Sequence, residues 1–182
     1  MQKIIFITGG ARSGKSTFAL KEASKISGKK AFIATAVGAY GDTPLQDGEM
    51  KERIENHKSH RGKDWDIYEE PLKIADIIKK IVGEYSIIII DCLTLWLSNL
   101  MHSNLNIEKE IEDLIGALID LSLVTSHLSQ MYIVSNEVGM GIVPDNKLAR
   151  RFRDMAGLLN QKIAEVANEF YMVVAGIPIR VK

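Results

Sequence analysis

A glycine-rich stretch near the amino terminus carries the clearest chemistry in this sequence. Residues 9–16 read GGARSGKS, which fits the pattern G-x-x-x-x-G-K-[ST], between an apolar run and a helical pattern. Glycines let the backbone wrap closely around an anion, and amide N–H groups at the helix amino end face its charge. Lys15 adds positive charge, and the Ser16 hydroxyl is suited to ligating Mg²⁺. The stretch therefore predicts a loop that binds a nucleoside triphosphate; the alternative is a plain glycine turn.

Two charged residues each have two interpretations. Arg12, inside the loop, either contacts phosphates or is an ordinary solvated side chain. Asp91 follows four isoleucines, a pattern typical of a buried strand that delivers a carboxylate to the edge of the sheet near the loop. We interpret Asp91 as a Mg²⁺ ligand, direct or through water, with a turn-capping aspartate as the alternative. Cys92 is most simply a small core residue.

A basic cluster with two histidines lies in the stretch RIENHKSHRGKDW, residues 53–65. His57 and His60 lie among arginines and lysines, without a cysteine or the H-x-x-x-H spacing that would indicate zinc. Basic residues suit the handling of a triphosphate, and a neutral imidazole is a competent nucleophile towards phosphorus. From the residues alone, a solvated polar helix end is the simpler interpretation.

A second cluster, SNEVGMGIVPDNKLARRFRD, spans residues 135–154. Its glycines and Pro144 predict a structured turn after a strand. Asn136 and Glu137 would then lie at the carboxyl edge of the sheet, where α/β folds bind ligands. A plain strand-to-helix loop is the alternative.

The elements that must position these residues alternate along the chain. Apolar runs predict strands, and 3.6-residue periodicity predicts helices. The expected strands cover residues 3–7, 29–36, 65–70 (an edge strand), 85–94, 130–139 and 171–182, the last with a candidate terminal hairpin. The expected helices cover residues 15–27, 49–58, 71–83, 106–128 and 145–170, with Gly157 as a candidate break, and residues 37–48 are expected to form an exposed loop. This order predicts an α/β fold with a largely parallel central sheet flanked by helices.

Composition narrows the classes of function. The 182 residues suit one domain, so we expect residues 1–182 to form a single nucleotide-binding domain. With 23 basic and 23 acidic residues, the charge gives no case for nucleic acid or a membrane surface as partner. The one cysteine excludes an intrachain disulfide and favours a reducing, cytoplasmic compartment. No apolar run reaches the roughly 20 residues that span a bilayer.

Several of these motifs together resemble one enzyme family. TGGARSGKS, EMKERIENHK, the acid-ended strand into CLT, and above all NEVGMGIVPDNKLARRFRDMAGLLNQKIA are similar to the bifunctional adenosylcobinamide kinase/adenosylcobinamide-phosphate guanylyltransferases. The resemblance covers essentially the whole chain. It implies phosphorylation of adenosylcobinamide, followed by transfer of GMP from GTP to adenosylcobinamide phosphate with release of pyrophosphate. It also implies a P-loop NTPase fold with a RecA-like sheet, Mg²⁺ as cofactor, ATP and GTP as substrates, and a homotrimer.

The resemblance also assigns roles to individual residues. In this family a histidine carries GMP as a phosphoramidate, and the match to R-I-x-x-H-[KR] puts that role on His57, reversing the simpler interpretation above. Lys15 is the implied catalytic lysine, with Ser16 and Asp91 as metal ligands. The implied nucleotide site comprises Gly9, Gly10, Ala11, Arg12, Ser13, Gly14, Lys15, Ser16, Ala34, Thr35, Ala36, Lys58, Ser59, His60, Arg61, Glu69 and Asp91.

Two rival functions remain at this point. A P-loop small-molecule kinase without guanylyl transfer would use His57 only structurally. A nucleotide-dependent regulatory switch would need a partner protein, and the chain lacks a base-specificity motif such as N-K-x-D. The preference for guanine therefore follows from the resemblance and not from a motif.

Overall fold

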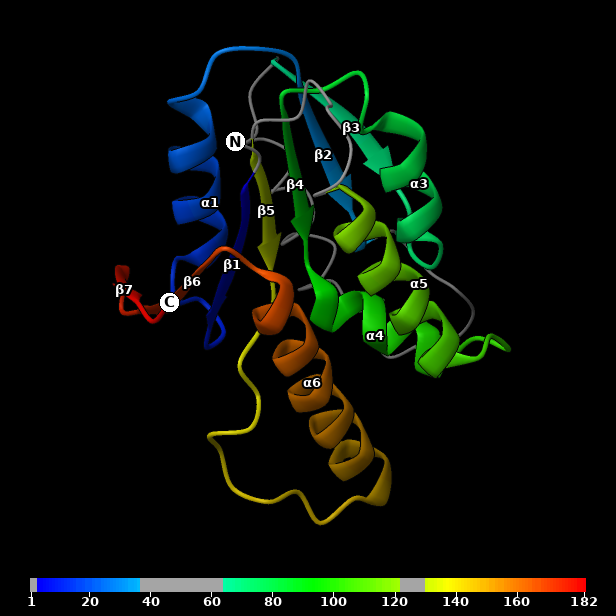
Figure 1. Ribbon diagram of the computed structural model, residues 1–182. Coiled ribbons are helices and arrows are strands. Elements are labelled where there is room, and N and C mark those ends of the chain that lie inside the picture. Colours follow the sequence, from blue (N-terminus) through cyan, green and yellow to red (C-terminus); the bar gives the residue numbers. More distant parts are fainter. Residues whose placement is uncertain (1–2, 37–63, 122–129) are drawn as a thin grey trace.

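A seven-stranded sheet forms the centre of the computed structural model, which describes residues 3–36, 64–121 and 130–182 (Figure 1). Its strands lie in the order β3-β2-β4-β5-β1-β6-β7, all parallel except β7, which runs antiparallel to β6. Their bounds are β1 Lys3–Gly9, β2 Lys30–Ala34, β3 Trp65–Glu69, β4 Ile87–Asp91, β5 Gln130–Val134, β6 Glu169–Val174 and β7 Ile177–Arg180. The predicted α/β class and largely parallel sheet are confirmed.

Helices cover both faces of this sheet (Figure 1). Their bounds are α1 Lys15–Ser24, α3 Ile74–Ile81, α4 Leu93–Met101, α5 Ile107–Leu121 and α6 Lys147–Val166. Helix α1 lies on one face, and α3 to α6 lie on the other. None of the helices in the described ranges is long and apolar enough to cross a bilayer.

Strand alternation explains the two faces. Successive side chains of a strand point to opposite sides of the sheet, so an apolar run buried on both sides feeds two cores. In β4, Ile87 and Ile89 pack in the core under α1, whereas Ile88 and Ile90 pack in the core under α3 to α6. The four isoleucines are fully buried, and their strand delivers Asp91 to the carboxyl edge.

The largest differences between the predicted elements and the structure concern α4, α6 and β5. Residues 93–94, expected to end a strand, begin α4, a helix that we did not expect. Helix α6 runs through Gly157 without a break, and it ends at Val166 rather than at residue 170. Strand β5 stops at Val134 instead of continuing to residue 139. The terminal hairpin and the edge position of β3 are confirmed, while the loop expected at 37–48 and the helix expected at 49–58 lie outside the described residues.

Candidate functional site

The predicted phosphate loop joins the carboxyl end of β1 to the amino end of α1. Gly14 immediately precedes α1 with φ of +94°, in the left-handed region that favours glycine. A Cβ at this position would also lie 3.2 Å from the Cα of Gly176, so the loop is backed closely by another part of the chain. Arg12 has φ of +57°, uncommon for a residue with a side chain, and it is exposed on the loop. The strand, loop and helix context required of a phosphate loop is therefore present.

Lys15 is buried inside this loop. Its side chain is 7% exposed, and its Nζ donates a hydrogen bond to the Gly10 carbonyl oxygen over 2.9 Å. Burial lowers the pKa of Lys15, and the nearby Cys92 and Asp91 act in the opposite direction and raise it. Lys15 begins α1, which packs against β4, and Asp91 ends β4, so the acid and the lysine lie on the same side of the sheet edge.

A buried polar latch, which we define as Thr35, Cys92 and Asn99, joins the ends of β2 and β4. The Thr35 hydroxyl donates to the Cys92 carbonyl and accepts from the Cys92 N–H, both over 2.8 Å. The Thr35 N–H donates to the Asp91 carbonyl over 3.2 Å, and Asn99 Nδ2 on α4 donates to the Thr35 carbonyl over 2.9 Å. Thr35 is fully buried, so these bonds fix the backbone from the Asp91 carbonyl through Cys92, directly after the Asp91 side chain.

The stretch after β5 is tied to the phosphate loop. The Asn136 N–H donates to the Thr94 hydroxyl over 2.6 Å, and Asn160 Nδ2 on α6 donates to the Asn136 carbonyl over 3.2 Å. The Glu137 N–H donates to the Gly9 carbonyl over 3.0 Å. Asn136 and Glu137 thus lie at the carboxyl edge of the sheet beside the loop, where the sequence placed them.

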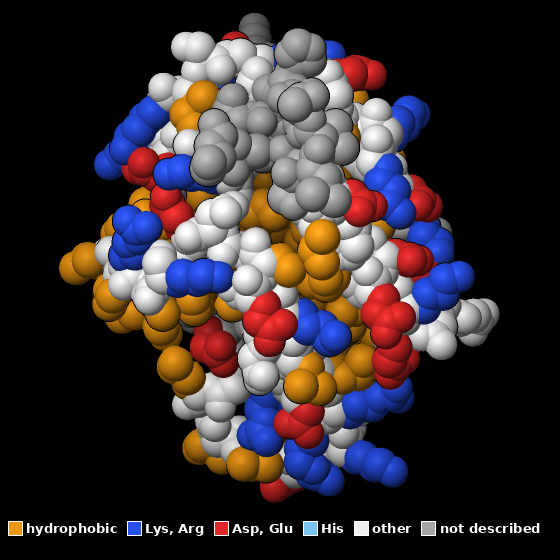
Figure 2. Space-filling view, viewed as in Figure 1, with side chains coloured by type: hydrophobic (Ala, Val, Ile, Leu, Met, Phe, Trp, Pro, Cys, Tyr) orange, Lys and Arg blue, Asp and Glu red, His pale blue; other side chains and the backbone are white. Residues whose placement is uncertain are grey.

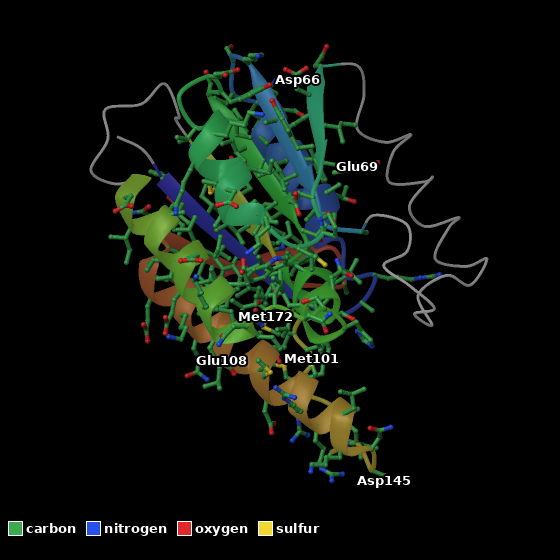
Figure 3. All side chains as sticks on the ribbon, turned by 90° about the vertical axis from the view of Figure 1, so that its right-hand side faces the viewer. Asp66, Glu69, Met101, Glu108, Asp145 and Met172 are labelled. Carbon is green, nitrogen blue, oxygen red and sulfur yellow. The ribbon has the colours of Figure 1, made fainter. Side chains whose placement is uncertain are left out.

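Glu69 lies farther away. It ends β3 at the outer side of the sheet, and its side chain is exposed. Figure 3 shows Glu69 farther along β3 than Asp66. It also shows Asp145 beyond the sheet, at the amino end of α6. Because β3 is four strand positions from β1, Glu69 and the phosphate loop are separated by roughly 19 Å at about 4.8 Å per strand.

The sheet therefore brings most of the described site residues to one edge. Residues 9–16, Ala34 to Ala36 and Asp91 all follow or end parallel strands that share their carboxyl ends. His57, Lys58, Ser59, His60 and Arg61 lie outside the described residues. The roles of Thr94, Asn99 and Gly176 were missed, because each acts through a hydrogen bond to a distant segment and no local spacing signals it.

Two of these residues are suited to hold Mg²⁺. Ser16, in the first turn of α1, and Asp91, at the end of β4, are both half-buried and supply oxygen atoms. Mg²⁺ is usually bound through one or two such protein oxygens together with phosphate oxygens and water. In the described ranges, no three side chains of His, Cys, Asp or Glu come together as a metal site. The oxygen donors present fit this cation.

These features define a class of protein. A phosphate loop between a parallel strand and a helix, with an acid-ended strand beside it, is the arrangement of a P-loop nucleotide-binding protein. Among solved structures, the fold is similar to the flagellar accessory protein FlaH from Methanocaldococcus jannaschii, with a TM-score of 0.56 and 13% identity over 99% of this chain and 78% of that one. It is also similar to the RadB recombinase, with a TM-score of 0.51 and 13% identity over 93% and 73%. The RecA-like fold is confirmed.

The sequence comparisons identify the family. The family model described as cobinamide kinase / cobinamide phosphate guanyltransferase matches residues 5–181, and the chain belongs to this family. It is 38% identical over 178 residues to the bifunctional adenosylcobalamin biosynthesis protein CobP of Pseudomonas aeruginosa, covering 97% of this chain and 95% of that protein. It is 34% identical over 197 residues to the corresponding CobU of Escherichia coli, covering 98% and 99%. The chain is a bifunctional cobinamide kinase and cobinamide phosphate guanylyltransferase of adenosylcobalamin biosynthesis.

Proposed function

We propose that both reactions use the single phosphate loop at residues 9–16, first with adenosylcobinamide and then with adenosylcobinamide phosphate as acceptor. The observation that supports this most directly is the burial of Lys15 within the loop, at the start of the helix that packs against the strand ending at Asp91. A buried positive charge beside a carboxylate suits the binding of a triphosphate together with a cation. In this proposal ATP or GTP feeds the kinase step, and GTP feeds the second step.

In the kinase step, the loop amides and Lys15 bind the phosphates. The Lys15 ammonium stabilises the charge on the transferred γ-phosphoryl group, the largest contribution expected of a protein in such a reaction. Ser16 and Asp91 would hold Mg²⁺, which when bound neutralises phosphate charge. The latch at Thr35 supports this role because it fixes the backbone at the Asp91 carbonyl and at Cys92. A hydroxyl oxygen of adenosylcobinamide gains the phosphoryl group, and the nucleoside diphosphate leaves.

In the guanylyl step, we assign the nucleophile to His57, which lies outside the described residues. An imidazole nitrogen of His57 attacks the α-phosphorus of GTP, and the bond to pyrophosphate breaks. A phosphate oxygen of adenosylcobinamide phosphate then attacks the phosphoramidate, which forms adenosylcobinamide-GDP and restores the imidazole. Two displacements at one phosphorus predict net retention of its configuration and ping-pong kinetics.

The remaining site residues complete the nucleotide site in this proposal. Thr35 belongs to the latch, with Ala34 and Ala36 on either side of it in the sequence, and Lys58 to Arg61 follow the nucleophile. Glu69 would contact the part of the nucleotide farthest from the phosphates, because it lies roughly 19 Å along the edge from the loop. We further propose that the enzyme is one nucleotide-binding domain, works in the cytoplasm and forms a homotrimer.

A two-stage product assay tests the proposed function. The chain is incubated with Mg²⁺, ATP and adenosylcobinamide, and GTP is added after the first product has formed. We expect a phosphorylated corrinoid first, then adenosylcobinamide-GDP with one pyrophosphate per product. Lys15→Ala should abolish both stages. Accumulation of adenosylcobinamide phosphate without adenosylcobinamide-GDP would favour the small-molecule kinase. Nucleotide hydrolysis without either corrinoid product would favour the regulatory switch.

A further inference from the structure

The turn of the carboxyl-terminal hairpin contacts the phosphate loop directly. The Gly176 N–H donates a hydrogen bond to the Ser13 carbonyl oxygen over 2.8 Å. Gly176 lies between β6 and β7, 163 positions along the chain from Ser13. Strand β6 pairs with β1 up to the start of the loop, with Val173 opposite Gly9, so the hairpin follows the loop at close range. Figure 1 shows β7 beside the amino end of α1.

Two close approaches surround this hydrogen bond. A Cβ at Gly9, which has φ of +155°, would lie 2.4 Å from the Val173 carbonyl oxygen. A Cβ at Gly14 would lie 3.2 Å from the Cα of Gly176 and 3.9 Å from a methyl carbon of Val173. The first and last glycines of the phosphate loop therefore rest on the hairpin, which forms the wall behind the loop.

The hairpin turn has a demanding backbone conformation. Val174 pairs with Ile177, so the turn consists of Ala175 and Gly176, with φ of +50° and +82°. Positive φ at both central residues is the signature of a type I′ turn, whose twist matches that of the flanking strands. Glycine adopts this conformation at Gly176 without steric cost, whereas a β-branched residue strongly opposes it.

A planar peptide links this turn to the amide that faces a bound anion. In a trans peptide the carbonyl and the next N–H point in opposite directions. Because the Ser13 carbonyl is directed at Gly176, behind the loop, the Gly14 N–H is directed to the opposite side. Ser13 is also 9% exposed, so water has little access to the residue in place of the Gly176 N–H.

We propose that Gly176 is a positioning residue for the phosphate loop: its N–H fixes the Ser13–Gly14 peptide with the Gly14 N–H directed at the nucleotide. This inference rests on the proposed binding of a triphosphate at residues 9–16. Gly176 makes no contact with the nucleotide in this account. It acts by holding the loop in its binding conformation, so its loss weakens nucleotide binding in both reactions.

Substitutions at Gly176 separate two effects on nucleotide binding: that of the turn's backbone conformation and that of the added side-chain volume. A Cβ at this position meets nothing within 4 Å, so sterics with neighbours do not interfere. Gly176→Asn keeps the left-handed conformation accessible, Gly176→Ala disfavours it and Gly176→Val opposes it most. The matched control is Gly28→Ala, which lies before β2 at the amino ends of the strands, away from the phosphate loop. There φ is +120°, and the new Cβ would lie 2.3 Å from Ser86 Oγ.

The measurement is the Kd of Mg–ATP by calorimetry, at a temperature where each variant is folded by circular dichroism. We expect Gly176→Val to raise Kd about fivefold to tenfold, a factor typical of one lost backbone hydrogen bond, and Gly176→Asn to stay within about twofold of wild type. Gly28→Ala should lower Tm without changing Kd. If Gly176→Val does not fold, Gly176→Ala is measured in its place. Its Kd should exceed that of the Asn variant, by a smaller factor than expected for valine.

The outcomes separate this inference from the proposed function. Equal Kd values for wild type, Asn, Ala and any folded Val variant would overturn the positioning role while leaving the nucleotide site intact. A Kd raised equally by Gly28→Ala would also overturn it, because general destabilisation would then explain the effect. A wild-type chain that binds no Mg–ATP would overturn the proposed function and the inference together.

Discussion

Replacing Thr35 by valine tests the latch that holds the strand end at Asp91. The substitution keeps the shape of the side chain and removes the hydroxyl. It leaves the Cys92 N–H without the partner that it has over 2.8 Å, whereas the Cys92 carbonyl keeps a second hydrogen bond, from the Trp96 N–H over 3.1 Å. Thr35 is fully buried, so water does not replace the lost group.

The expected cost follows from these partners. An orphaned buried N–H costs about 1–3 kcal/mol, and the loss of the second bond to the carbonyl adds about 0.5–1 kcal/mol. We therefore expect Thr35→Val to lower the free energy of unfolding by about 2–3 kcal/mol. For a chain of this length that corresponds to a Tm lower by roughly 5–10 °C.

Thr35→Ser is the matched control for this experiment. It keeps the hydroxyl and removes one buried methyl group, at a cost of about 1 kcal/mol. The assay is urea unfolding followed by circular dichroism at pH 7 without nucleotide. The latch predicts the stability order Thr, Ser, Val, whereas apolar packing alone predicts that valine is at least as stable as threonine. A valine variant within about 0.5 kcal/mol of wild type would refute the reasoning.

Three further predictions concern single charged or titratable groups. Hydrogen bonding to Lys3 over 2.8 Å lowers the pKa of Glu169 in the folded chain. The ionised Glu169 therefore stabilises the fold at pH values above its pKa in the unfolded chain, and this stabilisation is lost as the pH falls through its pKa in the folded chain. In urea unfolding, Glu169→Gln should thus cost roughly 0.5–1 kcal/mol at pH 7 and nothing at about pH 2; an equal cost at both pH values would contradict this. Burial raises the pKa of Cys92 to about 12, so iodoacetamide at pH 8 should label it, by mass spectrometry, only as fast as the chain unfolds; rapid labelling of the folded chain would contradict this. Asp91→Asn should raise the Mg²⁺ concentration for half-maximal kinase rate about tenfold or more, and an unchanged Mg²⁺ dependence would remove Asp91 from the metal site.

The sequence predicted the parts of the fold that have strong local signals. The apolar run ending at Asp91 and the glycines of the phosphate loop each occupy only a few consecutive positions. The run predicted strand β4, and the glycines predicted the turn between β1 and α1. Helix α4 was missed because it continues the apolar run of β4 and is buried on most of its surface, with Trp96 and Leu97 facing the core. A helix that is apolar nearly all round shows no 3.6-residue stripe, so periodicity does not separate it from a strand.

The absence of a break at Gly157 has a local cause. Gly157 does not break α6 because one glycine in a long helix costs only about 1 kcal/mol, and the contacts of Ala156 and Leu159 with the core compensate for it. Helix α6 begins where Asn146 Oδ1 accepts hydrogen bonds from the N–H groups of Leu148 and Ala149, a standard cap.

The candidate site was predictable where residue type alone indicates chemistry. Lys15, Ser16 and Asp91 were predicted as site residues because lysine, hydroxyl and carboxylate groups at these spacings suit phosphate and Mg²⁺. The supporting contacts of Thr35 and Gly176 were not predictable, since each joins segments more than 50 residues apart through a backbone group. Such contacts depend on strand order, which local periodicity does not determine.

The hairpin edge also shows what periodicity leaves open. Val174, Ile177, Ile179 and Val181 are exposed, although the alternation of Ile177, Ile179 and Val181 with other residues is that of a half-buried strand. Figure 2 shows these hydrophobic side chains gathered at the left edge of the molecule, over β7. The apolar run therefore predicted the strand correctly, but not that both sides of β7 would be exposed.

The central claim is that one chain transfers GMP through His57, and labelling tests it most directly. The chain is incubated with Mg²⁺ and α-labelled GTP without acceptor, and the labelled peptide is mapped. We predict an acid-labile, alkali-stable label on the peptide that contains His57. It should be absent in His57→Ala and retained in the control His102→Ala, a substitution of the exposed histidine after α4. Absence of label from a wild-type chain that binds GTP would contradict the histidine-linked transfer.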